Sequence, residues 1–210
     1  MNHKPVIILG AGGHAKVCLD LLKILHHEVL GFASPKRSQS VLKEVSCIGG
    51  DEEVLAYSPE GIWLVNGVGS TGNPTVRKDL FIYFKNHGYH FLTLIHPSAI
   101  ISQDVHMEEG VHVMAGAIIQ PGCRVDENTI LNTKASIDHD CKIGKHVHLA
   151  PAATLSGNVR VDDECHVGTG ANIVQNLHIG EKSIVGAGAL VIRDIQKGKT
   201  VAGVPAKELN

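Results

Sequence analysis

The segment LNTKASIDHDCKIGKHVHLAPAATL, residues 131–155, decides the fold because an aliphatic residue returns at every sixth position: Leu131, Ile137, Ile143, Leu149 and Leu155. The same step extends in both directions, so every sixth residue from position 101 to position 191 is aliphatic or Met. Helices repeat every 3.6 residues and flat strands every 2, and neither explains a period of six. A solenoid of short strands and turns does, because its stacked coils bury a continuous core.

A second position of each hexad, four residues after the aliphatic one, carries mostly small residues. It includes Cys123, Cys141 and Cys165, which we predict to be core residues and not nucleophiles or metal ligands. The composition agrees, because aromatic residues make up 4% of the chain and none follows Phe91. Narrow, identical coils have no room for rings, so the change in composition also marks a domain boundary near residue 95.

The first part of the chain alternates strand and helix patterns. Buried strands are predicted at residues 6–9, 28–32, 62–65 and 91–95, and helices after the glycine loop to Leu25, at 51–56 and at 73–86. Such alternation predicts a parallel sheet covered by helices. We therefore expect an α/β Rossmann-like domain over residues 1–95, followed by an all-β domain over residues 96–210. The hexads of this second domain resemble those of the left-handed parallel β-helix acyltransferases, and the resemblance implies a left-handed parallel β-helix in which three hexads form one coil.

The loop Gly10-Ala11-Gly12-Gly13-His14-Ala15 fits the dinucleotide pattern G-x-G-x-x-A. That pattern also requires an acid at the end of the second strand, where this chain has Phe32-Ala33-Ser34-Pro35, so we reject NAD. Glycines and a helix N-terminus still suit the diphosphate or sugar of another nucleotide. A tight turn without a ligand is the alternative.

The charge and cysteine patterns exclude several classes of protein. Nineteen basic and 21 acidic residues leave no basic stripe for nucleic acid. No apolar run reaches the roughly 18 residues that span a bilayer, and the N-terminus does not read as a signal peptide. Five scattered cysteines argue against a disulfide framework and for a reducing compartment. We therefore expect a cytoplasmic protein without membrane insertion.

Both halves together resemble one family, on the glycine loop, the junction Ile95–Ala99, the hexads, the segment Asn132–Gly144 and the ending Gly203–Lys207. The chain resembles the bacterial nucleotide-sugar acetyltransferases, the group that contains the sialic acid O-acetyltransferases and the acetyltransferase that makes UDP-N,N′-diacetylbacillosamine. The resemblance implies a homotrimer that uses acetyl-CoA as cosubstrate, binds a nucleotide sugar and needs no metal.

The resemblance also implies roles for individual residues. His139 matches the general base, and Asp140 matches the carboxylate that orients it, although Glu is commoner there. The acidic pair that reads uracil in relatives is missing at Ala33-Ser34. The acetyl-CoA site is expected to include His148, Gly157, Thr169 and Ala187, and the sugar-nucleotide site to include Gly12, Gly13, His14 and Gly69.

The residues themselves support a special role for His139. Its neighbours Asp138 and Asp140 should raise the pKa of the imidazole, which suits a base that must collect a proton. His148 lies nine residues later, half way round a coil of three hexads, so the two rings should face away from each other in one chain. The spacing therefore predicts a site completed by a neighbouring subunit.

Five histidines share the last position of a hexad, and we expect four of them on exposed corners. They are His106, His112, His148, His166 and His178.

The expected activity is acetyl transfer to the amino group of a nucleotide-linked sugar, a UDP-4-amino-4,6-dideoxy-N-acetylhexosamine, in surface glycan biosynthesis. Two alternatives remain open: O-acetylation of a sialic-acid-like sugar, and a noncatalytic trimeric scaffold. A zinc site on His139, His146 and His148, as in γ-type carbonic anhydrases, is disfavoured because it leaves the glycine-loop domain without a role.

Overall fold

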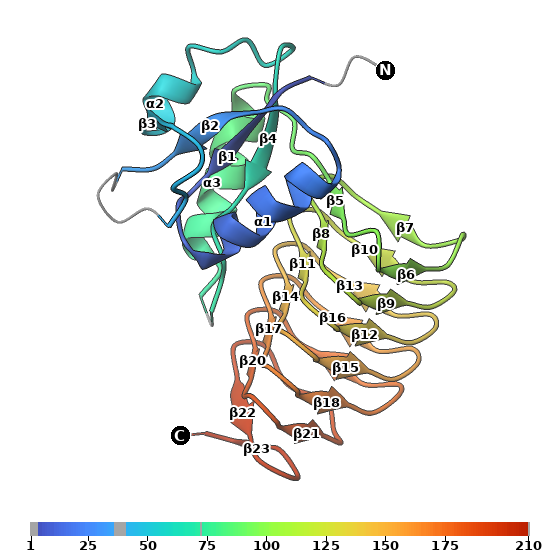
Figure 1. The fold of residues 1–210 in the computed structure, drawn as a ribbon. Coiled ribbons are helices and arrows are strands. Elements are labelled where there is room, and N and C mark those ends of the chain that lie inside the picture. The colour runs from blue at the N-terminus through green and yellow to red at the C-terminus, as the bar shows by residue number, and fades with distance from the viewer. Residues whose placement is uncertain (1–3, 36–40, 72, 210) are drawn as a thin grey trace. The chain divides into compact units, whose positions relative to one another are not determined.

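The computed structural model describes residues 4–35, 41–71 and 73–209 (Figure 1). The chain divides into two compact units, one formed by Met1–Gly69 with Thr75–Leu94 and the other by Ser70–Pro74 with Ile95–Asn210. Within the described ranges, no helix has the length and apolar character needed to cross a membrane.

The first unit is an α/β sheet domain, as the sequence predicts. Its parallel sheet has the order β3-β2-β1-β4, with β1 (Val6–Leu9), β2 (Val29–Ala33), β3 (Cys47–Gly49) and β4 (Trp63–Asn66). The strand β1 is completely buried because it pairs on both sides and carries only aliphatic side chains. The helices are α1 (Gly13–Ile24), α2 (Asp51–Val54) and α3 (Thr75–Asn86).

Two details differ from the expectation. The short strand β3 was not predicted, because three residues carry too little periodicity to identify. The run 91–95 was predicted to close the α/β sheet, but only Phe91 bridges to it, through Leu64. The strand β5 (Leu94–Ile95) instead joins the large sheet of the second unit. An apolar run of five residues cannot by itself tell which sheet it pairs with.

The second unit is a parallel β-helix with three sheets, which confirms the predicted solenoid (Figure 1). Its strands are mostly two residues long. In the two-residue strands after β5, up to β21, the second residue packs into the core and the first lies on the outer side of the coil. The strand β5 is reversed, with Leu94 buried and Ile95 exposed.

We name the three faces by the outward residues of their strands. The charged face consists of β7 (His106–Met107), β10 (Arg124–Val125), β13 (Lys142–Ile143), β16 (Arg160–Val161) and β19 (His178–Ile179). The neutral face consists of β6 (Ile100–Ile101), β9 (Ile118–Ile119), β12 (Ser136–Ile137), β15 (Thr154–Leu155), β18 (Asn172–Ile173) and β21 (Leu190–Val191). The histidine face consists of β5, β8 (His112–Val113), β11 (Ile130–Leu131), β14 (His148–Leu149), β17 (His166–Val167), β20 (Ile184–Val185), β22 (Thr200–Ala202) and the antiparallel β23 (Lys207–Glu208).

Three hexads make one coil, because residues 18 apart are paired on neighbouring strands. Arg124 pairs with Lys142, and Lys142 pairs with Arg160. The aliphatic and small positions of the hexads form one continuous buried core. Cys123, Cys141 and Cys165 belong to it, each at most 1% exposed, so the prediction that they are core residues is confirmed.

The corners of the coils repeat a left-handed backbone conformation, at the residue three positions after each inward residue from Met107 to Val185. Lys134 has φ +59° and Asp140 has φ +60°. Glycine fills this position at Gly110, Gly116 and Gly122. The non-glycine members are Asn128, Lys134, Asp140, His146, Ala152, Asn158, Glu164, Asn176 and Lys182. The fold therefore tolerates a backbone cost of about 1–2 kcal/mol at each non-glycine corner.

The substitution Lys134→Gly should raise the free energy of unfolding by roughly 0.5–1 kcal/mol. The left-handed backbone costs Lys more than glycine loses in chain entropy on folding. The matched control Lys142→Gly, in strand β13, should lower it. Denaturant unfolding followed by far-UV circular dichroism measures both, since every aromatic reporter lies in the first unit. A Lys134→Gly protein no more stable than the parent would contradict the strain.

Candidate active site

His139 lies on an exposed corner of the β-helix, between β12 on the neutral face and β13 on the charged face. Its backbone N–H donates to Asp138 Oδ1 at 2.8 Å, which fixes the turn. Its Nδ1 is 2.8 Å from Asp140 Oδ2. Because Nδ1–H donates to this carboxylate, Nε2 carries the lone pair and is the atom able to accept a proton.

The surroundings of His139 raise the pKa of its imidazole. The hydrogen bond that His139 donates to Asp140 has the largest effect, and the charges of Asp138 and Asp140 add to it, whereas desolvation acts in the opposite direction. The shorter Asp in place of Glu reaches the ring because the left-handed corner at Asp140 turns its side chain back onto it.

Gly157 lies one coil after His139 and is brought against its ring. A Cβ at Gly157 would lie 2.4 Å from His139 Nε2 and 2.5 Å from Cε1, closer than any real contact. The glycine lets the exposed imidazole occupy this position, because any side chain here would push the ring away, and the proton-accepting edge of His139 borders bare backbone. His139, Asp140 and Gly157 thus form one cluster.

His148 lies elsewhere, at the start of β14 on the histidine face, and is buried. Asn132 Nδ2 is 3.0 Å from its Nε2, and the carbonyl of Ser70 is 2.5 Å from its Nδ1. The ring of His166, one coil later, packs edge-on at 5.0 Å. The prediction of exposed corners for four of the five hexad-end histidines is wrong, because His112 is fully buried and His166 is half-buried on this face, and only His106 and His178 are exposed. These histidines begin strands and do not occupy corners.

Thr169 and Ala187 lie one coil apart at a second corner, between the histidine face and the neutral face. Both are exposed, and the Gly188 N–H donates to the Thr169 carbonyl at 2.8 Å. Gly168 is needed beside them, because a Cβ there would lie 2.6 Å from the Ala187 nitrogen. They could line the path of an extended ligand along this corner.

The two groups of predicted residues therefore border opposite edges of the neutral face. His139 and Gly157 lie at its edge with the charged face, and Thr169 and Ala187 at its edge with the histidine face. His146 lies at the third corner, where its Nδ1 is 2.9 Å from Asn128 Nδ2. One chain thus distributes His139, His146 and His148 over different parts of the coil.

In the α/β unit, the glycine loop opens helix α1 with exposed backbone. Gly12 is its N-cap and makes no side-chain cap bond, and the first turn holds no acid. Apart from its chain neighbours and the backbone of the helix itself, no atom of the described residues lies within 4 Å of a Cβ built on Gly12 or Gly13. Space beside a helix N-terminus suits a phosphate or sugar oxygen, because the N–H groups of the first turn point toward it.

Gly69 belongs to the same region, because a Cβ on it would lie 3.4 Å from His14 Cβ. The strands β1 and β4 are adjacent and parallel. After β1 the chain continues to β2 toward one edge of the sheet, and after β4 it continues to Phe91 at the other edge. Ligands of open α/β sheets bind at such a switch point. The predicted set Gly12, Gly13, His14 and Gly69 therefore shares one edge of the sheet.

Sequence reasoning missed the buried Arg77 on α3, which holds the loop after β4. Its Nη1 donates to the carbonyls of Asn66 at 2.5 Å and Val68 at 2.8 Å, and Asn66 Nδ2 donates to the Arg77 carbonyl. Burial lowers the pKa of Arg77 to about 9, and burial raises the pKa of the nearby Cys18 to about 12. A lone arginine at the start of a helix gave no signal of burial.

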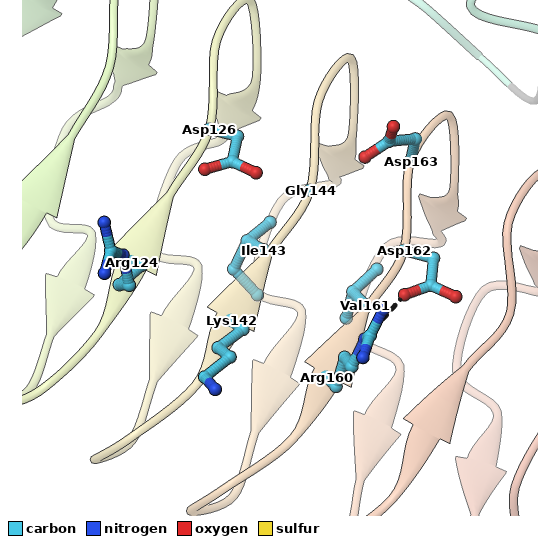
Figure 2. Close-up of a pocket in the computed structure, with 9 residues that line it drawn as sticks. All are labelled: Arg124, Asp126, Lys142, Ile143, Gly144, Arg160, Val161, Asp162 and Asp163. Atoms are coloured by element: carbon cyan, nitrogen blue, oxygen red, sulfur yellow. Dashed lines mark hydrogen bonds and ion pairs between the residues drawn. The ribbon is translucent and has the colours of Figure 1, made fainter.

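A separate hollow of about 340 Å³ lies on the charged face (Figure 2). Arg124, Lys142 and Arg160 follow one another on successive strands there, and Asp126, Asp162 and Asp163 line the other side. Arg160 Nε is 2.8 Å from Asp162 Oδ1. Three cations and three carboxylates balance, so the hollow has no net attraction for the phosphates of a nucleotide or of CoA.

Comparison with known proteins agrees with both units. The family model described as the PglD N-terminal domain matches residues 5–84. UDP-N-acetylbacillosamine N-acetyltransferase of Bacillus subtilis (strain 168) is 41% identical over 124 residues, 53% of this chain and 52% of that protein. The match thus spans about half the length of this curated relative.

Two solved structures match over nearly their whole length. The acetyltransferase domain of PglB from Neisseria gonorrhoeae FA1090, in complex with acetyl coenzyme A, is 35% identical with a TM-score of 0.91 over 99% of this chain and 100% of that one. PerB from Caulobacter crescentus, in complex with CoA and GDP-perosamine, is 35% identical with a TM-score of 0.91 over 98% of this chain and 97% of that one.

A glycine-loop α/β unit followed by a hexad β-helix is thus the architecture of a class of sugar acetyltransferases. This chain belongs to the PglD family of nucleotide-sugar acetyltransferases.

The substitution Asp140→Asn should move the acid limb of kcat/KM to lower pH. The carboxylate raises the pKa of His139, so its loss lets the unprotonated base persist at lower pH, while kcat falls because the ring loses its orienting partner. A pH-rate profile measures the shift. Asp138→Asn, which removes a smaller contribution, should move the limb less. An unmoved limb in Asp140→Asn would exclude His139 as the titrating base.

Proposed function

We propose that this chain is an acetyl-CoA-dependent N-acetyltransferase that acts on the amino group of a nucleotide-linked 4-amino sugar in glycan biosynthesis. The observation that carries the proposal is the His139 cluster, where the Nε2 edge of a carboxylate-paired imidazole borders the bare backbone of Gly157. A base beside an open backbone suits proton removal next to a developing oxyanion.

In the proposed reaction, the sugar amine attacks the thioester carbon of acetyl-CoA. A C–N bond forms, the C–S bond breaks, and CoA leaves as its thiolate. His139 Nε2 takes the proton from the attacking amine, and Asp140 holds the imidazole and stabilises the resulting cation. The Gly157 N–H is the proposed donor to the tetrahedral oxyanion. This chemistry uses no metal.

The nucleotide sugar is proposed to bind at the edge of the α/β sheet, at Gly12, Gly13, His14 and Gly69. The open N-terminus of α1 supports this, because its N–H groups can bind the diphosphate. The relatives are named for a UDP sugar and a GDP sugar, and Ser34 follows β2 where an acid would read uracil. We favour a UDP-4-amino-4,6-dideoxy sugar, and GDP-, dTDP- and CMP-linked sugars belong in the test panel.

We further propose that three copies assemble with their neutral faces toward the threefold axis. The outward residues of this face carry no charge, and Ile100 is 65% exposed, whereas the charged face suits solvent. In this arrangement one copy's edge with His139 and Gly157 meets the next copy's edge with Thr169 and Ala187. Closed threefold symmetry would then complete three identical acetyl-CoA sites, which also include His148.

The substitution His139→Ala should lower turnover by about 10²–10⁴-fold while acetyl-CoA still binds. Thiol release from acetyl-CoA with the panel of amino-sugar nucleotides measures turnover, and calorimetry measures binding. Near wild-type turnover in His139→Ala would contradict the assignment. Thiol release only with sugars that offer a hydroxyl group would favour O-acetylation. If none of the sugar nucleotides leads to thiol release, the noncatalytic scaffold is favoured.

Mixing two inactive variants tests the shared site. If His139 of one copy and His148 of the next form each site, a mixture of the two variants should regain activity. The His139→Ala and His148→Ala trimers are dissociated, mixed and reassembled. Threefold symmetry allows about one intact site in three within each mixed trimer. Each variant reassembled alone is the control. A mixture no more active than its components would place each complete site within one chain.

A further inference from the structure

A polar cluster on the histidine face fixes the ring of His148 from two sides. It consists of Asn132 at the end of β11, His148, His166 and Ser70. Ser70 belongs to the segment Ser70–Pro74, which forms one compact unit with the β-helix. His148 and Ser70 are 6% and 3% exposed, so the hydrogen bonds between them are shielded from water.

The orientation of the Asn132 amide is determined by its own neighbour. The backbone N–H of Thr133 donates to Asn132 Oδ1 at 2.8 Å. The amide oxygen is thereby identified, and the atom that faces His148 Nε2 at 3.0 Å is the donor Nδ2. Two donors cannot share a hydrogen bond, so His148 Nε2 must carry a lone pair.

The other nitrogen of the ring then carries the hydrogen. Ser70 offers His148 Nδ1 a carbonyl oxygen at 2.5 Å, and a carbonyl can only accept. The ring is therefore neutral and in the Nδ1–H tautomer. Protonation at Nε2 would place two N–H donors, those of His148 Nε2 and Asn132 Nδ2, against each other. The hydrogen bond from Asn132 to the ring would then be lost.

His166 adds no charge that could change this state. Burial, the larger effect, lowers the pKa of His166, while the Ser70 carbonyl acts in the opposite direction. Its Nδ1 is buried and has no hydrogen-bond partner in the part of the chain that the structure describes, so protonation there would leave an N–H unsatisfied. Among the described residues that contact the His148 ring, Asn132 presents an amide, His166 an imidazole and Ser70 a carbonyl.

We propose that Asn132 and Ser70 are positioning residues that hold His148 as the neutral Nδ1–H tautomer, so that it contributes a fixed, uncharged ring to the acetyl-CoA site. The placement at that site rests on the proposed function, whereas the tautomer does not. A cation here would repel a protonated amine substrate, and a second free base would compete with His139 for the proton. The arrangement leaves proton transfer to His139 alone.

The isosteric substitution Asn132→Asp tests the proposal, because a carboxylate accepts a hydrogen bond from Nε2 and favours the doubly protonated ring. Nitrogen NMR of histidine-labelled full-length protein reads the state directly, with His148 assigned from a His148→Gln variant. We expect wild-type His148 to remain in the Nδ1–H form from pH 6 to 8, and Asn132→Asp to give the imidazolium. In Asn132→Ala, which removes the amide donor without supplying an acceptor, His148 should protonate at a higher pH than in the wild type.

The chain supplies a matched control in Asn128 and His146, a second buried asparagine–histidine pair. Asn128→Asp should alter the His146 signals and leave those of His148 unchanged. In kinetics, Asn132→Asp should lower kcat about tenfold or more, whereas Asn128→Asp should not.

A wild-type His148 that titrates between pH 6 and 8, or that carries its hydrogen on Nε2, would overturn the proposal whatever the enzyme acetylates. The expected tautomer together with an inactive wild-type enzyme would instead contradict the proposed function. The expected tautomer together with an unchanged kcat in Asn132→Asp would overturn the positioning role.

Discussion

The narrow interior of the coil is the constraint on which the rest of the structure depends. Each hexad can bury one aliphatic side chain and one small one, and residues such as Ile137 and Cys141 are fully buried in this way. The remaining four positions of the hexad face outward or lie at a corner. The side chains that can bind ligands or exchange protons therefore lie at the outward and corner positions. The packing of the core determines where on the coil these positions are.

The same constraint explains how much the sequence could predict. The period of six predicted the solenoid and the buried cysteines, because both are direct consequences of the coil. The pairing of His139 with Asp140 was also accessible, since the two residues are adjacent. Gly157 could be matched to His139 through the family resemblance, and the offset of 18 residues explains why the pair meets.

Other features could not be predicted, for physical reasons. The buried state of Arg77 depends on carbonyls of the loop after β4, which no periodicity marks. The contact of Ser70 with His148 joins residues 78 apart through a segment without a pattern. His112 and His106 share a hexad position, yet one is buried and the other exposed, because the identity of the face and not the position in the hexad decides exposure.

The offset of 18 residues also limits how this chain can change in length. An insertion of one hexad, six residues, would leave the core pattern intact, since an aliphatic residue would still occur at every sixth position. It would nevertheless shift every later strand by one face of the coil. Thr169 and Ala187 would then no longer lie at the edge between the histidine face and the neutral face. Only insertions or deletions of a whole coil preserve the faces. The spacing between His139 and the residues that follow it is thus fixed in units of one turn, not of one hexad.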